Sequence, residues 1–180
     1  MMTKLRKSLC KVSFMRKDAK SANPGFTYPV GIITVRHDGK QNGMTAAWLM
    51  PVSIAPLIYC TSIGLTRYTH ELMDKAPSFG INILSGGQSE LANLFGKVSG
   101  KKKDKLSDPS VKLYEASKID CPMLEGCIAN IECKKVGEHT SGDHSLFIGE
   151  ALRCETDDEQ RPLLYSNMAY YSVGKKLLDR

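Results

Sequence analysis

The chain has 180 residues, of which 42% are hydrophobic and 24% charged, and its formal net charge is +6. This composition is typical of one globular domain and excludes an intrinsically disordered chain. No apolar run reaches the length of about 18 residues that a membrane-spanning helix needs, and the N-terminus lacks the apolar core of a signal peptide. We therefore expect a cytoplasmic protein with no membrane partner.

The positive charge is concentrated at the N-terminus. The first twenty residues contain seven Lys or Arg side chains and one acidic residue, Asp18, whereas the other 160 residues are balanced. A nucleic-acid-binding face needs basic residues along a groove with aromatic residues between them, and this segment offers only Phe14. We therefore expect no nucleic-acid partner, and we interpret residues 1–25 as a basic extension of a domain over residues 26–180.

The cysteines are expected to be reduced thiols. In the absence of a secretory signal, disulfides are disfavoured, and without a Cys-x-x-Cys motif a structural zinc site is poorly supported. We therefore predict no metal site. Cys127 and Cys133 fall on one face of a predicted strand, which indicates buried thiols rather than a redox pair. The remaining cysteines are Cys10, Cys60, Cys121 and Cys154.

The first half of the chain predicts short strands with tight turns. Asp38-Gly39 is the strongest hairpin signal. Ser53–Pro56 reads as a strand breaker, and a helix should end before Pro77. The expected elements are a strand over Tyr28–Val35, a return strand over Asn42–Trp48, a strand over Leu57–Ile63 and a helix over Thr69–Lys75.

The second half continues this pattern. A helix over Gln88–Phe95 should end at Gly96, and a polar loop or short helix should follow over Val98–Asp108. Further strands are expected over Phe79–Leu84, Cys127–Val136, Leu146–Cys154 and Pro162–Tyr171. The sequence predicts many short strands and two small helices, and the strands and helices do not alternate as in βαβ units. This pattern indicates a mainly β protein, a closed or nearly closed antiparallel barrel.

Familiar catalytic and nucleotide-binding motifs are missing from the sequence. No glycine-rich dinucleotide or P-loop signature occurs, and no Ser, Cys or Asp lies in a nucleophile elbow. His70-Glu71 begins like a zinc-protease helix, but Asp74 stands where the second histidine would be.

Two segments are candidates for a ligand site. Small residues at 45–47 let a flat ligand approach a strand backbone, and Arg67 with the hydroxyls of Ser62 and Thr69 could hold a phosphate. The residues alone leave plainer interpretations open: an interior strand, a capped helix start, a solvated lysine-rich loop and a hairpin turn at Gly142-Asp143-His144.

Seven motifs occur together and in order. They are Pro29-Val30, Asn42-Gly43-Met44-Thr45-Ala46-Ala47-Trp48, Ser62, Arg67-Tyr68-Thr69, Phe79-Gly80-Ile81-Asn82, Ser99-Gly100 with Asp104-Lys105, and Gly142-Asp143-His144 through Gly149-Glu150. This series resembles the flavin reductase-like family, FMN-binding split β-barrels that include the flavoredoxins. The resemblance covers about residues 26–172.

The resemblance implies a noncovalent FMN site in a homodimer, with the flavin near the subunit interface. The isoalloxazine would lie against the backbone of Thr45, Ala46 and Ala47, with Ser62 and Ile63 near the ribityl chain. Arg67, Thr69 and Lys105 would face the phosphate, with Ser99 as a further hydroxyl. Asn42, Met44, Trp48 and Asn82 complete the expected cofactor-binding set, and His144 would help to position nicotinamide.

The function implied is that of a flavin-dependent oxidoreductase of the flavin reductase type, which passes reducing equivalents from NAD(P)H through FMN to an acceptor. Two alternatives stay open. One is a flavoredoxin-like electron-transfer protein that takes electrons from a protein donor and has no NAD(P)H site. The other is a flavin-binding barrel without turnover.

Overall fold

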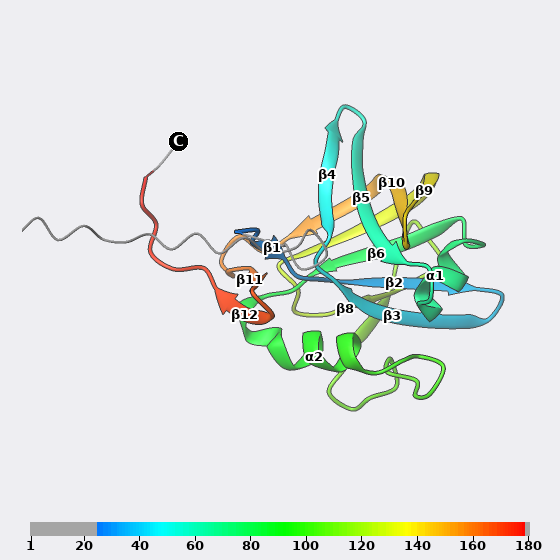
Figure 1. The fold of residues 1–180 in the computed structure, drawn as a ribbon, viewed down its shortest axis with the longest axis horizontal. Coiled ribbons are helices and arrows are strands. Elements are labelled where there is room, and N and C mark those ends of the chain that lie inside the picture. Colours follow the sequence, from blue (N-terminus) through cyan, green and yellow to red (C-terminus); the bar gives the residue numbers. More distant parts are fainter. Residues whose placement is uncertain (1–24, 179–180) are drawn as a thin grey trace, which may run out of the picture.

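The computed structural model describes residues 25–178 (Figure 1). Among these residues no helix has the length and apolar character needed to cross a membrane. The strands are β1 (Tyr28–Pro29), β2 (Gly31–His37), β3 (Lys40–Ala46), β4 (Leu49–Ile54), β5 (Leu57–Gly64), β6 (Ser78–Ile83), β7 (Leu113–Glu115), β8 (Pro122–Leu124), β9 (Ala129–Ser141), β10 (His144–Thr156), β11 (Leu163–Ser166) and β12 (Ala169–Ser172). The helices are α1 (Tyr68–Met73), the 3₁₀ turn η2 (Gly86–Gln88) and α2 (Ser89–Lys97).

The main sheet has seven antiparallel strands in the order β3-β2-β6-β9-β10-β5-β4. Its two edge strands, β3 and β4, are consecutive in the chain, and the backbone N–H of Ser62 on β5 donates to the carbonyl of Trp48 between them. The sheet therefore curls until its edges approach each other, but β3 and β4 do not pair. The expected mainly β split barrel with a few short helices is confirmed, whereas full closure is not observed.

Strand β2 is buried on both faces and separates two hydrophobic clusters. Ile33 and Val35 belong to the barrel interior with Phe79 and Phe147, while Ile32 packs with the cluster beneath α2. Successive strand residues point to opposite faces. The continuous apolar run of β2 therefore places it at the centre of the fold, with its neighbour β3 at the edge of the sheet.

Several local expectations are confirmed and others are wrong. The Asp38-Gly39 turn has φ values of 50° and 70°, the geometry of a type I′ hairpin. By contrast, α2 continues through Gly96 to Lys97. The segment expected to break the chain over 53–56 contains the end of β4, and only Ala55-Pro56 forms the turn. The last expected strand is two strands, β11 and β12, separated by a turn at Asn167-Met168.

Small sheets flank the barrel. β1, β11 and β12 form one, and β7 pairs with β8 to form the other, which the sequence did not predict. The cysteines within residues 25–178 are free thiols, as expected, and Cys10 lies outside the described residues. Burial raises the pKa of Cys127 and Cys133 to about 12, so both thiols are unreactive near neutral pH. They belong to different clusters, so the prediction that they share a face is wrong.

Candidate functional site

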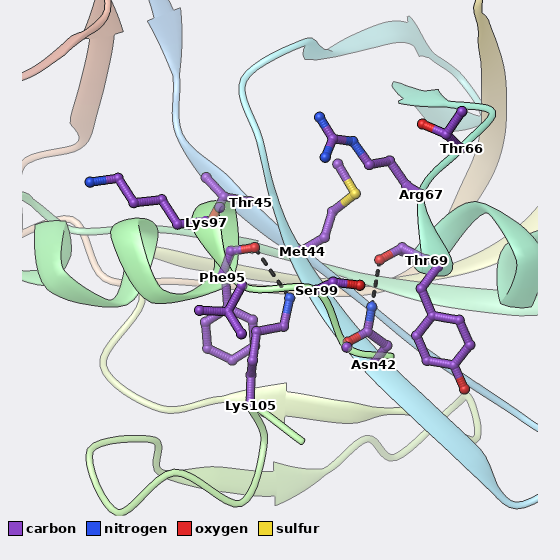
Figure 2. Close-up of a pocket in the computed structure, with 14 residues that line it drawn as sticks. Asn42, Met44, Thr45, Thr66, Arg67, Thr69, Phe95, Lys97, Ser99 and Lys105 are labelled. Carbon is purple, nitrogen blue, oxygen red and sulfur yellow. Dashed lines mark hydrogen bonds between the residues drawn. The ribbon is translucent and has the colours of Figure 1, made fainter. Parts of the chain in front are cut away.

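A cavity of about 170 Å³ lies along the outer edge of β3 (Figure 2). Its walls come from β3, the start of α1, the last turn of α2 and the loop over residues 98–105. Of the residues predicted to bind a cofactor, seven line it together: Asn42, Met44, Thr45, Arg67, Thr69, Ser99 and Lys105.

The position of β3 explains why residues from both of its faces reach this cavity. Met44 and Thr45 are adjacent, so their side chains point to opposite faces of the strand, yet both line the cavity. The cavity therefore wraps around the strand edge, which pairs with no other strand among the described residues. The Thr45 hydroxyl donates to the Ala92 carbonyl at 2.7 Å and so fixes α2 against this edge.

Helix α1 supplies the opposite wall and is anchored from the β9–β10 hairpin. Lys135 Nζ donates to the carbonyls of Met73 and Asp74, at 2.7 Å each, at the C-terminal end of the helix. His70 Nε2 lies 2.9 Å from the hydroxyl of Ser145, which is fully buried. These contacts fix the helix, and with it the side chains at its start that face the cavity.

Asn42 and Thr69 join the two walls at the floor of the cavity. Both are buried, and Asn42 Nδ2 donates to Thr69 Oγ1 at 2.8 Å (Figure 2). Arg67 immediately precedes α1 and is exposed, and Figure 2 shows its side chain beside that of Met44. The guanidinium is therefore free to meet an anion that enters from solvent.

Lys105 is the most unusual group in the cavity. Its side chain is 2% exposed, and Nζ donates to the Phe95 carbonyl at 3.3 Å. Burial, and to a lesser extent the charge of Arg67, lower the pKa of the Lys105 ammonium from 10.5 to about 8. Within residues 25–178 no carboxylate forms an ion pair with it. Two cations that face one cavity without a counterion indicate a site for an anion.

Other predicted residues lie outside the cavity. Ala46 and Ile63 are buried in the barrel core, and Ala47 follows the end of β3. The Ile63 side chain is 0% exposed and cannot touch a ligand, so any contact near Ser62 and Ile63 must come from backbone or from Ser62.

Asn82 is a structural residue, and its assignment to the cofactor site is wrong. Its side chain is completely buried. Nδ2 donates to the Ile32 carbonyl and to Thr34, and Oδ1 accepts from the Leu124 N–H and from Asn130. The amide has no capacity left for a ligand and instead joins β2, β6, β8 and β9.

His144 and Trp48 form a second group beside the cavity. Their ring centroids are 4.9 Å apart, and Trp48 is 47% exposed. His144 Nδ1 lies 2.7 Å from Asp143 Oδ1, and this hydrogen bond is the main cause that lowers the pKa of Asp143. His144 pairs with Gly64, where an added Cβ would lie 3.6 Å from His144 Nε2 and 3.7 Å from Arg67 Cγ. The imidazole is therefore close to Arg67, although it does not line the cavity.

The cavity also has lining residues that the sequence reasoning did not identify. Phe95 was predicted only as the last residue of a helix, and its carbonyl accepts the hydrogen bond from Lys105. The helix was predicted to end at Phe95, two residues before the observed end of α2 at Lys97, so the rest of this wall was not recognised. The other unpredicted residues are Thr66, Tyr68, Gly96, Lys97, Val98 and Gly100.

Comparison with known proteins identifies the family. The flavin reductase like domain matches residues 23–174. The chain belongs to the flavin reductase-like family. An FMN reductase (NADH), SmoA, of Agrobacterium fabrum is 28% identical over 84% of this chain and 82% of its own length. An NADH-dependent FAD reductase of Streptomyces globisporus is 25% identical over 77% of this chain and 76% of its own length.

The fold of a flavin-binding relative is also similar. An FMN-binding protein from Thermus thermophilus superposes with a TM-score of 0.81 and 26% identity, covering 93% of this chain and 99% of its own. The split-barrel class inferred from the sequence thus has a solved counterpart, and the family resemblance proposed from the seven motifs is confirmed.

Proposed function

We propose that this flavin reductase-like oxidoreductase binds FMN at the edge of β3 and passes reducing equivalents from NAD(P)H through FMN to an acceptor. The observation that carries the proposal is the buried Lys105 ammonium, which faces the same cavity as Arg67 without a carboxylate partner in the described part of the chain. FMN would supply the redox chemistry, and the protein would supply binding and orientation.

The cavity fits one end of FMN. A phosphate monoester carries about −1.5 to −2 charges near neutral pH, which Arg67 and Lys105 together balance. The hydroxyls of Thr69 and Ser99 lie in the same cavity and are further candidate donors. We call Arg67, Thr69, Ser99 and Lys105 the phosphate clamp.

The volume of the cavity suggests where the isoalloxazine lies. At about 170 Å³ it is smaller than the roughly 300–1,000 Å³ of complete ligand pockets. The phosphate and part of the ribityl chain would fill it. The ring would extend along the unpaired edge of β3, past the small residues Thr45, Ala46 and Ala47, toward Trp48. Backbone N–H and C=O groups on that edge are available to a heterocycle.

FMN is the specific cofactor proposed, and FAD is the alternative that a named relative supports. The purified protein should show a flavin absorbance spectrum or acquire one on titration. FMN should bind more tightly than riboflavin, because riboflavin lacks the phosphate. A protein that stays colourless with excess FMN or FAD would refute the proposal, and preference for FAD would correct the cofactor.

NAD(P)H is proposed as the reductant, as the name of the NADH-dependent FMN reductase relative suggests. His144 is partly exposed beside Trp48 and is oriented by Asp143. It could fix nicotinamide against the flavin, where productive transfer needs the reacting atoms about 3–3.5 Å apart. His144→Ala should slow anaerobic bleaching of bound flavin by NADH or NADPH by about 10- to 100-fold, with FMN affinity unchanged.

Two controls separate this enzyme from a flavoredoxin-like carrier. Dithionite needs no docking site, so it should bleach wild type and the His144→Ala variant equally. If neither nicotinamide bleaches the wild type over minutes, the carrier is the better function, and a protein donor must supply the electrons.

A homodimer is proposed to cover the exposed side of the flavin. In the β4–β5 hairpin, which projects from the rest of the sheet in Figure 1, Met50, Val52 and Ile54 are 59%, 49% and 91% exposed. β4 is also an unpaired edge among the described strands. Apolar side chains on a free strand edge favour a protein partner. The mass in solution at micromolar concentration tests this, and a monomer with flavin bound would contradict it.

A further inference from the structure

The lysine run Lys101–Lys103 lies in the loop over 98–105, between two members of the phosphate clamp. Ser99 precedes the run and Lys105 follows it, but the three lysines themselves do not line the cavity. The side chains of Lys101 and Lys103 are equally half exposed, at 55% and 52%. A function for these charges must therefore be indirect.

The two lysines have different partners. Lys103 pairs with Asp108 at 2.7 Å, only five residues further along the chain. Lys101 instead pairs with Glu71 on α1, and its Nζ lies 5.8 Å from the centroid of the Tyr68 ring. Lys101 therefore ties the loop to the helix that forms the opposite wall of the cavity.

The neighbouring residue, Gly100, lies directly against β3 and the start of α1. A Cβ at this position would be 2.2 Å from Asn42 Oδ1 and 2.9 Å from Tyr68 Cδ1. Real Cβ contacts are not this short, so only glycine allows the loop to approach so closely. The loop thus rests on β3 and α1 at Gly100 and is secured there by the Lys101–Glu71 ion pair.

A compact turn links this contact to the clamp. The backbone N–H groups of Lys102 and Lys103 donate to the Ser99 carbonyl at 3.0 and 3.2 Å, and the Lys101 N–H donates to Ser99 Oγ at 3.3 Å. A displacement of Lys101 would therefore carry Ser99 with it. Four residues after Lys101 the chain reaches buried Lys105, which would lose its shielding if the loop moved outward.

We propose that Lys101 and Glu71 are positioning residues: their ion pair holds the loop against α1 so that Ser99 and Lys105 face Arg67 across the cavity. Neither side chain lines the cavity. The inference rests on the proposed FMN site, and it assigns the lysine run a part in phosphate recognition without contact to the phosphate.

A simpler explanation makes a different prediction. If Lys101 acted only as one more positive charge near the phosphate, Glu71 would act as a negative one. Lys101→Met would then weaken FMN binding and Glu71→Gln would strengthen it. If the ion pair holds the loop, both substitutions must weaken FMN binding, because each breaks the same contact.

The test compares FMN dissociation rates by stopped-flow fluorescence in wild type, Lys101→Met and Glu71→Gln. Both variants should release FMN about 2- to 20-fold faster, the range for a half-exposed ion pair with an added cation–aromatic contact. Lys103→Met is the matched control and should leave the rate unchanged. Riboflavin release should change less than FMN release, because the loop acts through the phosphate clamp. Tighter FMN binding by Glu71→Gln would overturn the proposal.

The exchanged pair, Lys101→Glu with Glu71→Lys, distinguishes positioning from loss of structure. If the contact itself matters, the double variant should recover most of the slow FMN release of the wild type. Lys101→Glu alone and Glu71→Lys alone should each release FMN faster than Lys101→Met or Glu71→Gln. A double variant as fast as the single exchanges would contradict the proposal.

A measurement without flavin keeps this inference separate from the proposed function. Acetylation of Lys105 in the flavin-free protein, followed by mass spectrometry of its peptide, reports whether the loop shields the amine. Lys101→Met and Glu71→Gln should both accelerate it by at least about twofold, and Lys103→Met should not. Unchanged Lys105 labelling in both variants would refute the positioning role. Failure of the wild type to bind either FMN or FAD would instead refute the proposed function.

Discussion

The lowered pKa of Lys105 predicts a distinctive pH dependence of FMN binding. With a pKa of about 8 in the free protein, Lys105 is about nine-tenths ammonium at pH 7 and about one-tenth at pH 9. The phosphate of FMN has a second pKa of about 6 and is a dianion at both pH values. Binding at pH 9 therefore requires Lys105 to take up a proton, which should weaken FMN affinity about tenfold relative to pH 7.

The assay is titration of the flavin-free protein with FMN at pH 7, 8 and 9, followed by fluorescence, with riboflavin as the comparison. Riboflavin has the same ring but no phosphate, so titration of the ring cancels in the ratio of the two affinities. Lys105→Met should abolish the tenfold step for FMN and leave riboflavin unaffected. If the affinities for FMN and riboflavin fall by the same factor between pH 7 and 9, Lys105 does not contact the phosphate.

The loss of FMN affinity at high pH cannot be explained by a destabilising effect of Lys105 on the folded protein. A lysine whose folded-state pKa is depressed binds fewer protons in the folded than in the unfolded protein between pH 8 and 10.5. This lysine therefore contributes an increase in the free energy of unfolding as the pH rises through that range. The contribution of Lys105 to stability and the FMN affinity should therefore change in opposite directions. The thermal stability of the flavin-free wild type relative to Lys105→Met at the same pH values measures this contribution, because buried thiols such as Cys127 and Cys133, whose pKa values are raised, act in the opposite sense in both proteins.

Three further substitutions test separate parts of the structure. Arg67→Ala should weaken FMN by several kcal/mol where the bonds to phosphate are desolvated and should scarcely alter riboflavin binding; equal losses would mean a structural role. Gly100→Ala should weaken FMN more than riboflavin, because its Cβ would displace the loop that carries Lys105. Thr61 Oγ1 is buried without a hydrogen-bond partner in the described structure. Thr61→Val should therefore raise the free energy of unfolding in urea by about 1 kcal/mol, whereas no gain would indicate a bound water.

The sequence predicted best where local chemistry determines the backbone. Asp38-Gly39 specifies its hairpin because both residues accept a positive φ. Strand β4 was missed because Pro51 and Pro56 lie in and beside it. Proline is tolerated in an edge strand, because on the free side of that strand no neighbouring strand needs a hydrogen bond from the missing N–H. Whether a strand lies at an edge is a property of the whole sheet and is not written in the segment itself.

The motif residues divide in the same way. Asn42 and Asn82 are both buried asparagines within the motifs of this sequence, yet Asn42 lies at the cavity floor and Asn82 is saturated by four partners. A motif gives the residue type and its place in the chain. It does not state which hydrogen bonds the folded protein has already used.

The proposed phosphate clamp shows why tertiary structure decides the chemistry here. Its residues come from the start of α1 and from the loop after α2, and β3 provides the floor between them. In sequence Arg67 and Lys105 are ordinary basic residues 38 positions apart. In the fold, the charge of one lowers the pKa of the other. An anion bound between the two cations would offset their mutual repulsion, so we expect the cavity to favour a ligand that carries a phosphate.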